Sequence, residues 1–335
     1  MTEKILRVGQ AGIANHGRTI VNAIRDSGNL QLVSCFDINA TASDKVAKEF
    51  SASAKTSYDE LVNDPGIDAV ALVTPNHLHA DQVTKAVKAK KHIFVEKPIA
   101  NTVLEAQEMI AQAEGAGLVF MVGHNTRRRL VFRRAKELLN QKTIGQIIAV
   151  EANLSRPVGL QPEMPAWKAD RKTCPLVPMM QLGIHFVDTV EYLIAPVVRV
   201  SCLAAHIAMR NEALDATAAI LQLESGVPVS LTSYYVSADT YFVRIYGTKG
   251  TIHCYPLKLQ LDLLENGNFK ESIHEDYSSE GAGSYILQMR EFGECVLQGT
   301  KTETGGTEGL RALAVIEAMV KSAEKHTVVE LSDIL

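Results

Sequence analysis

The sequence predicts an N-terminal α/β domain with a Rossmann-like, doubly wound parallel sheet, followed by an α+β domain with a large, mainly antiparallel open sheet. Three observations lead to this expectation. The chain has 335 residues, more than one core usually holds. Short, mostly apolar runs alternate with helical patterns up to residue 122, and apolar and polar residues alternate one by one in later segments. We therefore expect domains at residues 1–122 and 123–335.

In the first domain, five apolar runs predict strands that are buried on both faces. They are Ile5–Gly9, Leu32–Phe36, Ala69–Val73, His92–Val95 and Val119–Val122. Between them, residues 80–87 and 103–113 place apolar side chains at helical spacing. Short buried strands separated by helices indicate βαβ units, whose ligand site lies at the carboxyl ends of the strands.

The second domain shows a two-residue period. Leu259, Leu261 and Leu263 alternate with polar residues, which predicts a strand with one buried face. Asn266-Gly267 follows this strand and suits the two positive φ angles of a hairpin turn. Residues 247–250 predict a second turn. Helices are expected at residues 181–194, 284–298 and 307–324.

The composition is that of an ordinary globular protein, with 46% hydrophobic and 21% charged residues. A net charge of -4 argues against a nucleic-acid partner, because no excess of basic side chains is present to neutralise phosphates. No uncharged apolar stretch approaches the ~20 residues that span a bilayer, so no membrane association is expected. Five widely spaced cysteines, without metal-ligand spacing, indicate a reducing compartment, which predicts a cytoplasmic location and no bound metal.

A glycine-containing turn follows the first predicted strand. Against the dinucleotide-binding pattern G-x-G-x-x-G/A, Gly9 and Ala14 fit, while Ala11 stands where the second glycine allows close approach of a pyrophosphate. Gly12 beside it restores room, and Ile13 completes the turn. The motif alone is weak, because any tight turn from a strand into a helix needs small residues.

Asp37 strengthens the dinucleotide interpretation. It ends the second apolar run, where a carboxylate accepts hydrogen bonds from the adenosine ribose hydroxyls. Because a carboxylate repels a 2′-phosphate, the residue favours NAD over NADP. The alternative is that Asp37 caps a helix that begins near Thr41.

Two later segments are more specific. Thr74-Pro75-Asn76 and Glu96-Lys97-Pro98 each follow a predicted parallel strand, with His79 three residues after the first segment. With Gly123-His124-Asn125, Leu182-Gly183-Ile184-His185 and Asp188, these motifs resemble the glucose–fructose oxidoreductase/inositol dehydrogenase (Gfo/Idh/MocA) family across essentially the whole chain.

The resemblance implies an oxidoreductase that transfers a hydride between a nicotinamide cofactor and a secondary alcohol of a sugar, inositol or related polyol. Residues implied to bind the cofactor are Gly9, Ala11, Gly12, Ile13, Ala14, Asp37, Thr74, Pro75, Asn76, His79, Glu96, Lys97 and Pro98. It further implies that Lys97 hydrogen-bonds the reacting hydroxyl, and it suggests a cis bond between Lys97 and Pro98.

The resemblance also implies that His185 transfers the proton of that hydroxyl. Here the chain departs from the common pattern, because Gln181 stands four residues before His185 where the family often has Asp. An amide can orient an imidazole, but it cannot stabilise the protonated ring as a carboxylate does. Candidate substrate contacts are Asn125, Arg127, Trp167 and Arg171.

Two alternatives remain open at this point. Some members of the family oxidise a sugar transiently and act as NAD-dependent glycosidases or lyases, and others are non-catalytic dinucleotide-binding sensors. Both Lys97 and His185 are present, which speaks against a sensor. An exposed face of the antiparallel sheet would suit a homodimer or homotetramer.

Overall fold

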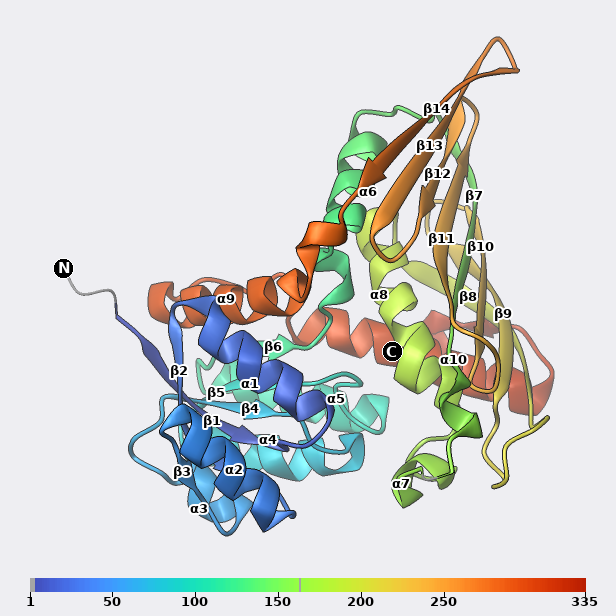
Figure 1. The fold of residues 1–335 in the computed structure, drawn as a ribbon. Coiled ribbons are helices and arrows are strands. Elements are labelled where there is room, and N and C mark those ends of the chain that lie inside the picture. The colour runs from blue at the N-terminus through green and yellow to red at the C-terminus, as the bar shows by residue number, and fades with distance from the viewer. Residues whose placement is uncertain (1–3, 163) are drawn as a thin grey trace. The chain divides into compact units, whose positions relative to one another are not determined.

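The computed structural model describes residues 4–162 and 164–335. The chain divides into two compact units (Figure 1). The first contains the described residues up to Asn125 together with residues 282–310, and the second contains residues 126–281 and 311–335. The expected division at residue 122 was contiguous, whereas in the structure a late segment returns to the first unit. The reason is the helix at residues 283–298, which packs on the first helix of the chain.

The first unit is built on a parallel six-stranded sheet with the order β3-β2-β1-β4-β5-β6. Its strands are β1 (Leu6–Ala11), β2 (Leu30–Phe36), β3 (Ser53–Ala54), β4 (Ala69–Leu72), β5 (His92–Val95) and β6 (Phe120–Val122). The order reverses direction between β1 and β4, and in doubly wound sheets this is where ligands bind.

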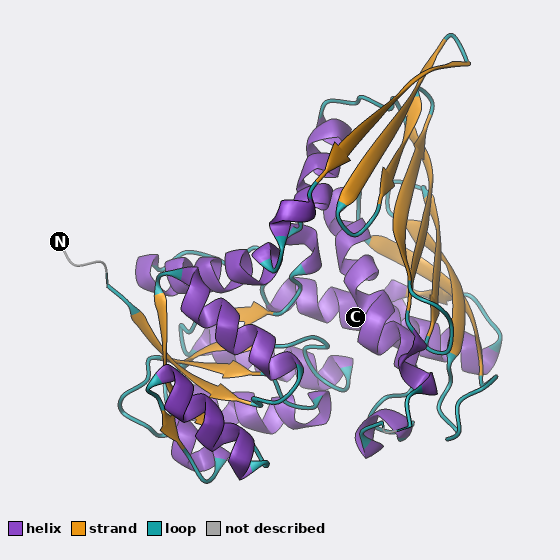
Figure 2. Cartoon of the chain, viewed as in Figure 1, coloured by secondary structure: helices purple, strands orange, loops and turns teal. Residues whose placement is uncertain are grey.

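Helices cover both faces of this sheet, with α1 and α9 on one face and α4 and α5 on the other (Figure 2). The helical segments are α1 (His16–Ser27), α2 (Ala40–Phe50), α3 (Tyr58–Val62), η1 (Asn76–Leu78), α4 (His79–Lys88), α5 (Val103–Gly115) and α9 (Gly283–Gln298). Side chains of Asn39, Ser57 and Thr102 cap α2, α3 and α5. Phe292 of α9 packs edge-on against Phe94 of β5, which fixes α9 to the core.

The second unit is built on a nine-stranded sheet with the order β14-β13-β12-β11-β7-β10-β9-β8-β15. Only the β7–β10 pair within this sheet is parallel among the described residues. The strands are β7 (Ile147–Ser155), β8 (Val197–Ala205), β9 (Ala216–Leu223), β10 (Pro228–Tyr234), β11 (Thr240–Gly247), β12 (Gly250–Cys254), β13 (Lys258–Glu265), β14 (Asn268–Asp276) and β15 (Val329–Glu330).

Helices α6 and α8 pack on one face of the nine-stranded sheet (Figure 2). The helical segments of this unit are η2 (Thr126–Arg128), α6 (Leu130–Asn140), η3 (Pro157–Leu160), α7 (Ala166–Ala169), η4 (Met179–Gly183), α8 (Ile184–Leu193), η5 (Ser278–Glu280) and η6 (Leu331–Asp333), and α10 (Gly306–Lys325) continues into it from the first unit. None of the described helices combines the length and apolar character needed to cross a lipid bilayer.

The predicted fold class is confirmed, and so are both predicted turns. Asn266 and Gly267 have φ angles of 53° and 79° and join β13 to β14. The turn at residues 247–250 joins β11 to β12. The helix expected at residues 181–194 is instead a short π-helical turn, η4, followed by α8.

Candidate active site

The turn between β1 and α1 depends on a glycine at one position. Gly12 has a φ of +83°, and a Cβ atom there would lie 2.3 Å from the carbonyl oxygen of Val73. Ala11 is buried as the last residue of β1, and a Cβ atom on Gly9 would lie 2.8 Å from the Ile67 side chain. Gly12 therefore allows the turn to pack closely against the backbone at Val73.

The amino end of α1 follows this turn and has no side-chain cap. The Gln10 side chain donates hydrogen bonds of 2.8 Å to the carbonyl oxygens of both Gly12 and Gly17. Asn15 precedes α1 without a side-chain cap, and the first turn contains no acidic residue. A helix end with such backbone N–H groups suits a phosphate.

Asp37 holds the same turn from the end of β2. Its carboxylate accepts hydrogen bonds from the backbone N–H groups of Ile13 at 2.7 Å, Ala14 at 3.1 Å and Asn39 at 2.9 Å. Helix α2 is capped by Asn39 and not by Asp37. Asp37 therefore connects the turn after β1 with the end of β2.

A pocket of about 380 Å³ opens beside Asp37. Asp37 and Asp44 contribute two carboxylates to its lining, and Lys55 is its basic residue. Lys55 forms an ion pair with Asp64 at 2.9 Å, so its charge is already compensated. The pocket is therefore electrostatically unfavourable for an additional phosphate.

His79 braces the two loops that follow β4 and β5. The residue is buried, with Nδ1 lying 3.1 Å from the carbonyl oxygens of both Pro98 and Ile99, and Nε2 lying 3.0 Å from that of Thr74. Burial lowers the pKa of His79 and outweighs the neighbouring carbonyl groups. The ring thus connects the loop after β4 with the loop after β5 through their backbone carbonyl groups.

The loop after β5 presents a lysine beside a buried carboxylate. Glu96 accepts a 3.1 Å hydrogen bond from the Lys97 backbone N–H, and its other oxygen lies 3.1 Å from Nε2 of His16. Burial would raise the pKa of Glu96, but His16 and Lys97 outweigh it and hold the pKa below its ordinary value. The Lys97–Pro98 bond is cis, as the resemblance suggested. On the neighbouring loop, Asn76 is buried and donates to Asn101 at 2.8 Å.

In the second unit, His185 lies in the first turn of α8. The preceding π-helical turn is defined by a bond from the Ile184 N–H to the carbonyl oxygen of Met179, five residues back. π-Helical turns occur frequently at functional sites. Gln181 lies within this turn, and its amide contacts the buried Cys174 thiol at 3.8 Å.

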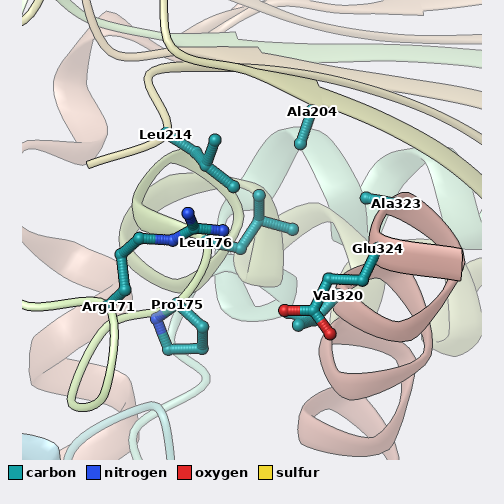
Figure 3. Close-up of a pocket in the computed structure, with 8 residues that line it drawn as sticks. All are labelled: Arg171, Pro175, Leu176, Ala204, Leu214, Val320, Ala323 and Glu324. Atoms are coloured by element: carbon teal, nitrogen blue, oxygen red, sulfur yellow. The ribbon is translucent and has the colours of Figure 1, made fainter. Parts of the chain in front are cut away.

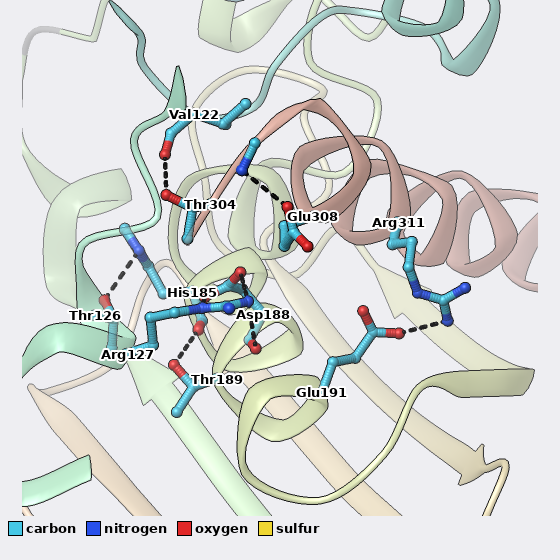
Figure 4. A network of polar contacts seen from close by, with 11 residues as sticks. Val122, Thr126, Arg127, His185, Asp188, Thr189, Glu191, Thr304, Glu308 and Arg311 are labelled. Carbon is cyan, nitrogen blue, oxygen red and sulfur yellow. Dashed lines mark hydrogen bonds and ion pairs between the residues drawn. The ribbon is translucent and has the colours of Figure 1, made fainter. Parts of the chain in front are cut away.

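Segment η2 lies against α8 and contacts His185 directly (Figure 4). The hydroxyl oxygen of Thr126 lies 3.1 Å from Nδ1 of His185. The next residue, Arg127, donates two hydrogen bonds to the buried carboxylate of Asp188 and stacks over the ring of Tyr192 at 5.1 Å. The guanidinium of Arg127 thus holds η2 to α8.

The other three proposed substrate contacts are each held by different neighbours. Asn125 belongs to the first unit and donates to the Ser284 hydroxyl at 3.0 Å. Trp167 lies in α7, with the ammonium of Lys168 5.3 Å from its ring centroid. Arg171 lines a cavity of about 120 Å³ together with Glu324 of α10 (Figure 3). Of the four proposed substrate contacts, Arg127 binds the helix that carries His185.

Comparison with known proteins identifies the family of this chain. Residues 6–124 match the Gfo/Idh/MocA oxidoreductase family with an NAD-binding Rossmann fold, and residues 136–331 match the C-terminal alpha/beta domain of the same family. The chain belongs to the Gfo/Idh/MocA family.

Relatives in this family act on carbohydrates. The chain is 27% identical to 1,5-anhydro-D-fructose reductase of Ensifer adhaerens, over 93% of this chain and 94% of that protein. It is also 27% identical to inositol 2-dehydrogenase 1 of Saccharopolyspora erythraea, over 97% and 96% of the two chains. A solved levoglucosan dehydrogenase with NADH and levoglucosan shares the fold, with a TM-score of 0.89, 20% identity, and coverage of 98% of this chain and 100% of that one. These relatives do not favour the glycosidase, lyase and sensor alternatives.

The residues of the first unit fit the NAD that this family binds. The uncapped end of α1 suits a pyrophosphate, and the close packing at Gly12 brings the turn against the loop after β4. The carboxylate of Asp37 lies at the strand end where an adenosine ribose is held. Among residues 4–162 and 164–335, no group of three or more His, Cys, Asp or Glu side chains is arranged to hold a metal ion.

Several residues of the site were missed in the sequence. Thr126 and His16 were not singled out, so the contact of His16 with Glu96 was not expected, and Gln10 was not connected with the glycine turn. Thr126 lies between two residues that were singled out, Asn125 and Arg127, and this adjacency was its only signal. His16 and Glu96 are distant in sequence, so no local spacing reveals their contact. Gln10 lies close in sequence to Gly12 and Gly17, but its residue type gives no sign that its side chain binds their carbonyl groups.

Proposed function

We propose that this chain is an NAD-dependent dehydrogenase that oxidises a secondary alcohol of a sugar, inositol or related polyol. Bound NAD supplies the hydride acceptor. The observation that carries the proposal is the placement of Lys97 at the carboxyl end of β5, on a loop fixed by Glu96 and His79. Membership of an NAD-binding oxidoreductase family supports it.

Lys97 and His185 have different roles in this proposal. The Lys97 ammonium donates a hydrogen bond to the substrate hydroxyl oxygen and stabilises the negative charge that develops there. The imidazole of His185 accepts the hydroxyl proton, so that loss of a hydride and a proton leaves a carbonyl group. Gln181 is assigned to the same site because it lies in the π-helical turn four residues before His185, where it adds no charge.

Substitution of Lys97 tests the reaction. Purified protein is incubated with NAD and a panel of polyols, aldoses and glycosides, and the absorbance of the reduced nicotinamide is followed. We expect Lys97→Met to lower turnover by roughly 10²–10⁴-fold with little change in NAD affinity, and His185→Asn to lower it similarly. Lys88→Met, at an exposed position of α4, is the matched control. Strong residual turnover in Lys97→Met would remove this lysine from the mechanism.

The coenzyme preference is proposed on electrostatic grounds. The carboxylates of Asp37 and Asp44 line the pocket at the end of β2, and they would repel a 2′-phosphate. Binding of NAD and NADP, measured side by side, should therefore favour NAD. Equal or tighter binding of NADP would contradict the assignment.

We further propose that the protein is a cytoplasmic homodimer or homotetramer. All five cysteines are thiols, which supports a reducing compartment. On the outer face of the nine-stranded sheet, Leu203, Ile220 and Val328 are 70%, 56% and 58% exposed. An exposed apolar patch of this kind supports self-association, because contact with a second copy would remove it from water. Ile220→Asp should lower the molar mass measured by light scattering, whereas an unchanged mass would place the interface elsewhere.

A further inference from the structure

The hydroxyl of the buried residue Thr126 lies against Nδ1 of His185. Oγ1 of Thr126 is 3.1 Å from Nδ1 of His185, and both residues belong to the second unit (Figure 4). Thr126 is 6% exposed, whereas His185 is partly exposed. The contact therefore lies on the protected side of the imidazole.

The surroundings keep this contact in place. Arg127, the neighbour of Thr126, is paired with Asp188, which follows His185 by nearly one turn of α8. The hydroxyl of Thr189 donates to the backbone carbonyl oxygen of His185 at 2.7 Å. The ion pair fixes the segment that carries the hydroxyl to the helix that carries the ring, whereas the Thr189 bond lies within α8 and does not reach the ring.

A neutral imidazole carries one proton, on either Nδ1 or Nε2, and the partner of one nitrogen decides which form is populated. A general base must present a nitrogen without a proton to the substrate. If Nδ1 holds the proton and donates it to the Thr126 oxygen, Nε2 has the required lone pair. A threonine hydroxyl can accept this bond and still donate its own proton.

We propose that Thr126 is a positioning residue that fixes the proton of neutral His185 on Nδ1, so that Nε2 accepts the proton of the substrate. The inference rests on the proposed function of His185. In this chain position 181 is Gln and not the Asp that the family often has. The neutral hydroxyl of Thr126 would therefore take over part of the role of a carboxylate in orienting the imidazole. Thr126 acts only through His185.

Nuclear magnetic resonance of ¹⁵N-histidine-labelled full-length protein tests the proposal without substrate. Spectra are recorded at about pH 8, above the ordinary His pKa of about 6.5, and the His185 signals are identified by their loss in His185→Gln. We expect the Nδ1–H tautomer in the wild type and in Thr126→Ser. In Thr126→Val the tautomer ratio should shift toward Nε2–H by roughly tenfold, the equilibrium equivalent of one net hydrogen bond.

Thr189→Val is the matched control, because it removes a buried hydroxyl that binds the backbone of His185 and not its ring. It should leave the tautomer unchanged. In turnover assays, Thr126→Val should lower kcat about tenfold with a nearly constant KM, and Thr126→Ser should restore it.

An Nε2–H tautomer in the wild type, or an unchanged tautomer in folded Thr126→Val, would overturn the proposal. The tautomer measurement needs no turnover, so it decides whether Thr126 fixes the ring proton even if the Lys97 experiment refutes the dehydrogenase reaction.

Discussion

The guanidinium of Arg127 and the carboxylate of Asp188 form a two-point ion pair inside the second unit, with Nε of Arg127 3.0 Å from one carboxylate oxygen. The two side chains are 8% and 1% exposed. Removal of one partner leaves the other charge buried without compensation, which costs far more than the loss of an exposed pair.

We therefore expect Arg127→Met to lower the free energy of unfolding by about 3–5 kcal/mol. The double variant Arg127→Met/Asp188→Leu should recover much of this loss, because no unpaired charge remains. Arg25→Met removes an exposed pair with Asp26 and should have little effect. Denaturant unfolding of the three variants measures the difference, and equal effects of Arg127→Met and Arg25→Met would contradict the prediction.

The hydrogen bonds that Asp37 accepts from the turn after β1 predict how its substitution affects NAD binding. Asp37→Ala removes the acceptor for the N–H groups of Ile13 and Ala14, so NAD affinity should fall about tenfold or more. Asp44→Asn removes a charge from the same pocket without touching the turn, and it should weaken NAD binding much less. Calorimetric titration with NAD measures both. Similar losses in the two variants would mean that the charge of the pocket, and not the hydrogen bonds of Asp37 with the turn, controls NAD affinity.

Two glycines with nearly the same φ angle allow the effect of backbone strain to be distinguished from that of a steric clash. Gly12 and Gly28 have φ angles of +83° and +85°, but a Cβ atom on Gly12 would lie 2.3 Å from the Val73 oxygen, whereas nothing lies within 4 Å of one on Gly28. Gly28→Ala should lower the free energy of unfolding by about 1–2 kcal/mol through backbone strain alone. Gly12→Ala should cost more and also weaken NAD binding. Equal losses of stability would show that the turn relaxes around the added methyl group.

The lowered pKa values of two histidines predict how the free energy of unfolding depends on pH. Burial lowers the pKa values of both His79 and His92 in the folded protein. The unfolded chain therefore takes up protons first as the pH falls below about 6.5, so the stabilisation is present above this pH and is lost below it. His92→Asn keeps an acceptor for the Val119 N–H but cannot titrate. The fall in unfolding free energy between about pH 7.5 and pH 5.5 should be smaller in this variant, and an identical fall would exclude His92 as a contributor.

Local patterns were enough to predict the parts of the fold that are buried on both faces or end in a distinctive turn. The run His92–Val95 coincides with β5, and Asn266-Gly267 forms the hairpin between β13 and β14. Strand β14 itself gives no such signal, because its side chains are almost all exposed and it is held by backbone pairing to β13. The helical pattern of α9 predicted its existence, but not that Phe292 would pack on Phe94, since the covering surface is distant in sequence.

In the candidate site, too, local sequence patterns indicated single residues but not their contacts with distant segments. Asp37 could be proposed from its position at a strand end, and the structure adds its contacts with the turn. His79 was expected among the cofactor-binding residues, but its contacts with Thr74 and Pro98 require two loops to be brought together by the sheet. Thr126 could not be singled out by residue type, because a threonine acquires a specific role only through its neighbour in space, here His185.

The return of residues 282–310 to the first unit has a consequence for synthesis of the chain on the ribosome. Helix α9 contributes Met289 and Phe292 to the core around β1 and α1, yet every strand from β7 to β14 is translated before it. The nucleotide-binding unit therefore cannot complete its core while only its amino-terminal part has emerged. A nascent chain arrested near residue 125 should expose apolar surface on α1 and be a substrate for chaperones until α9 has been made.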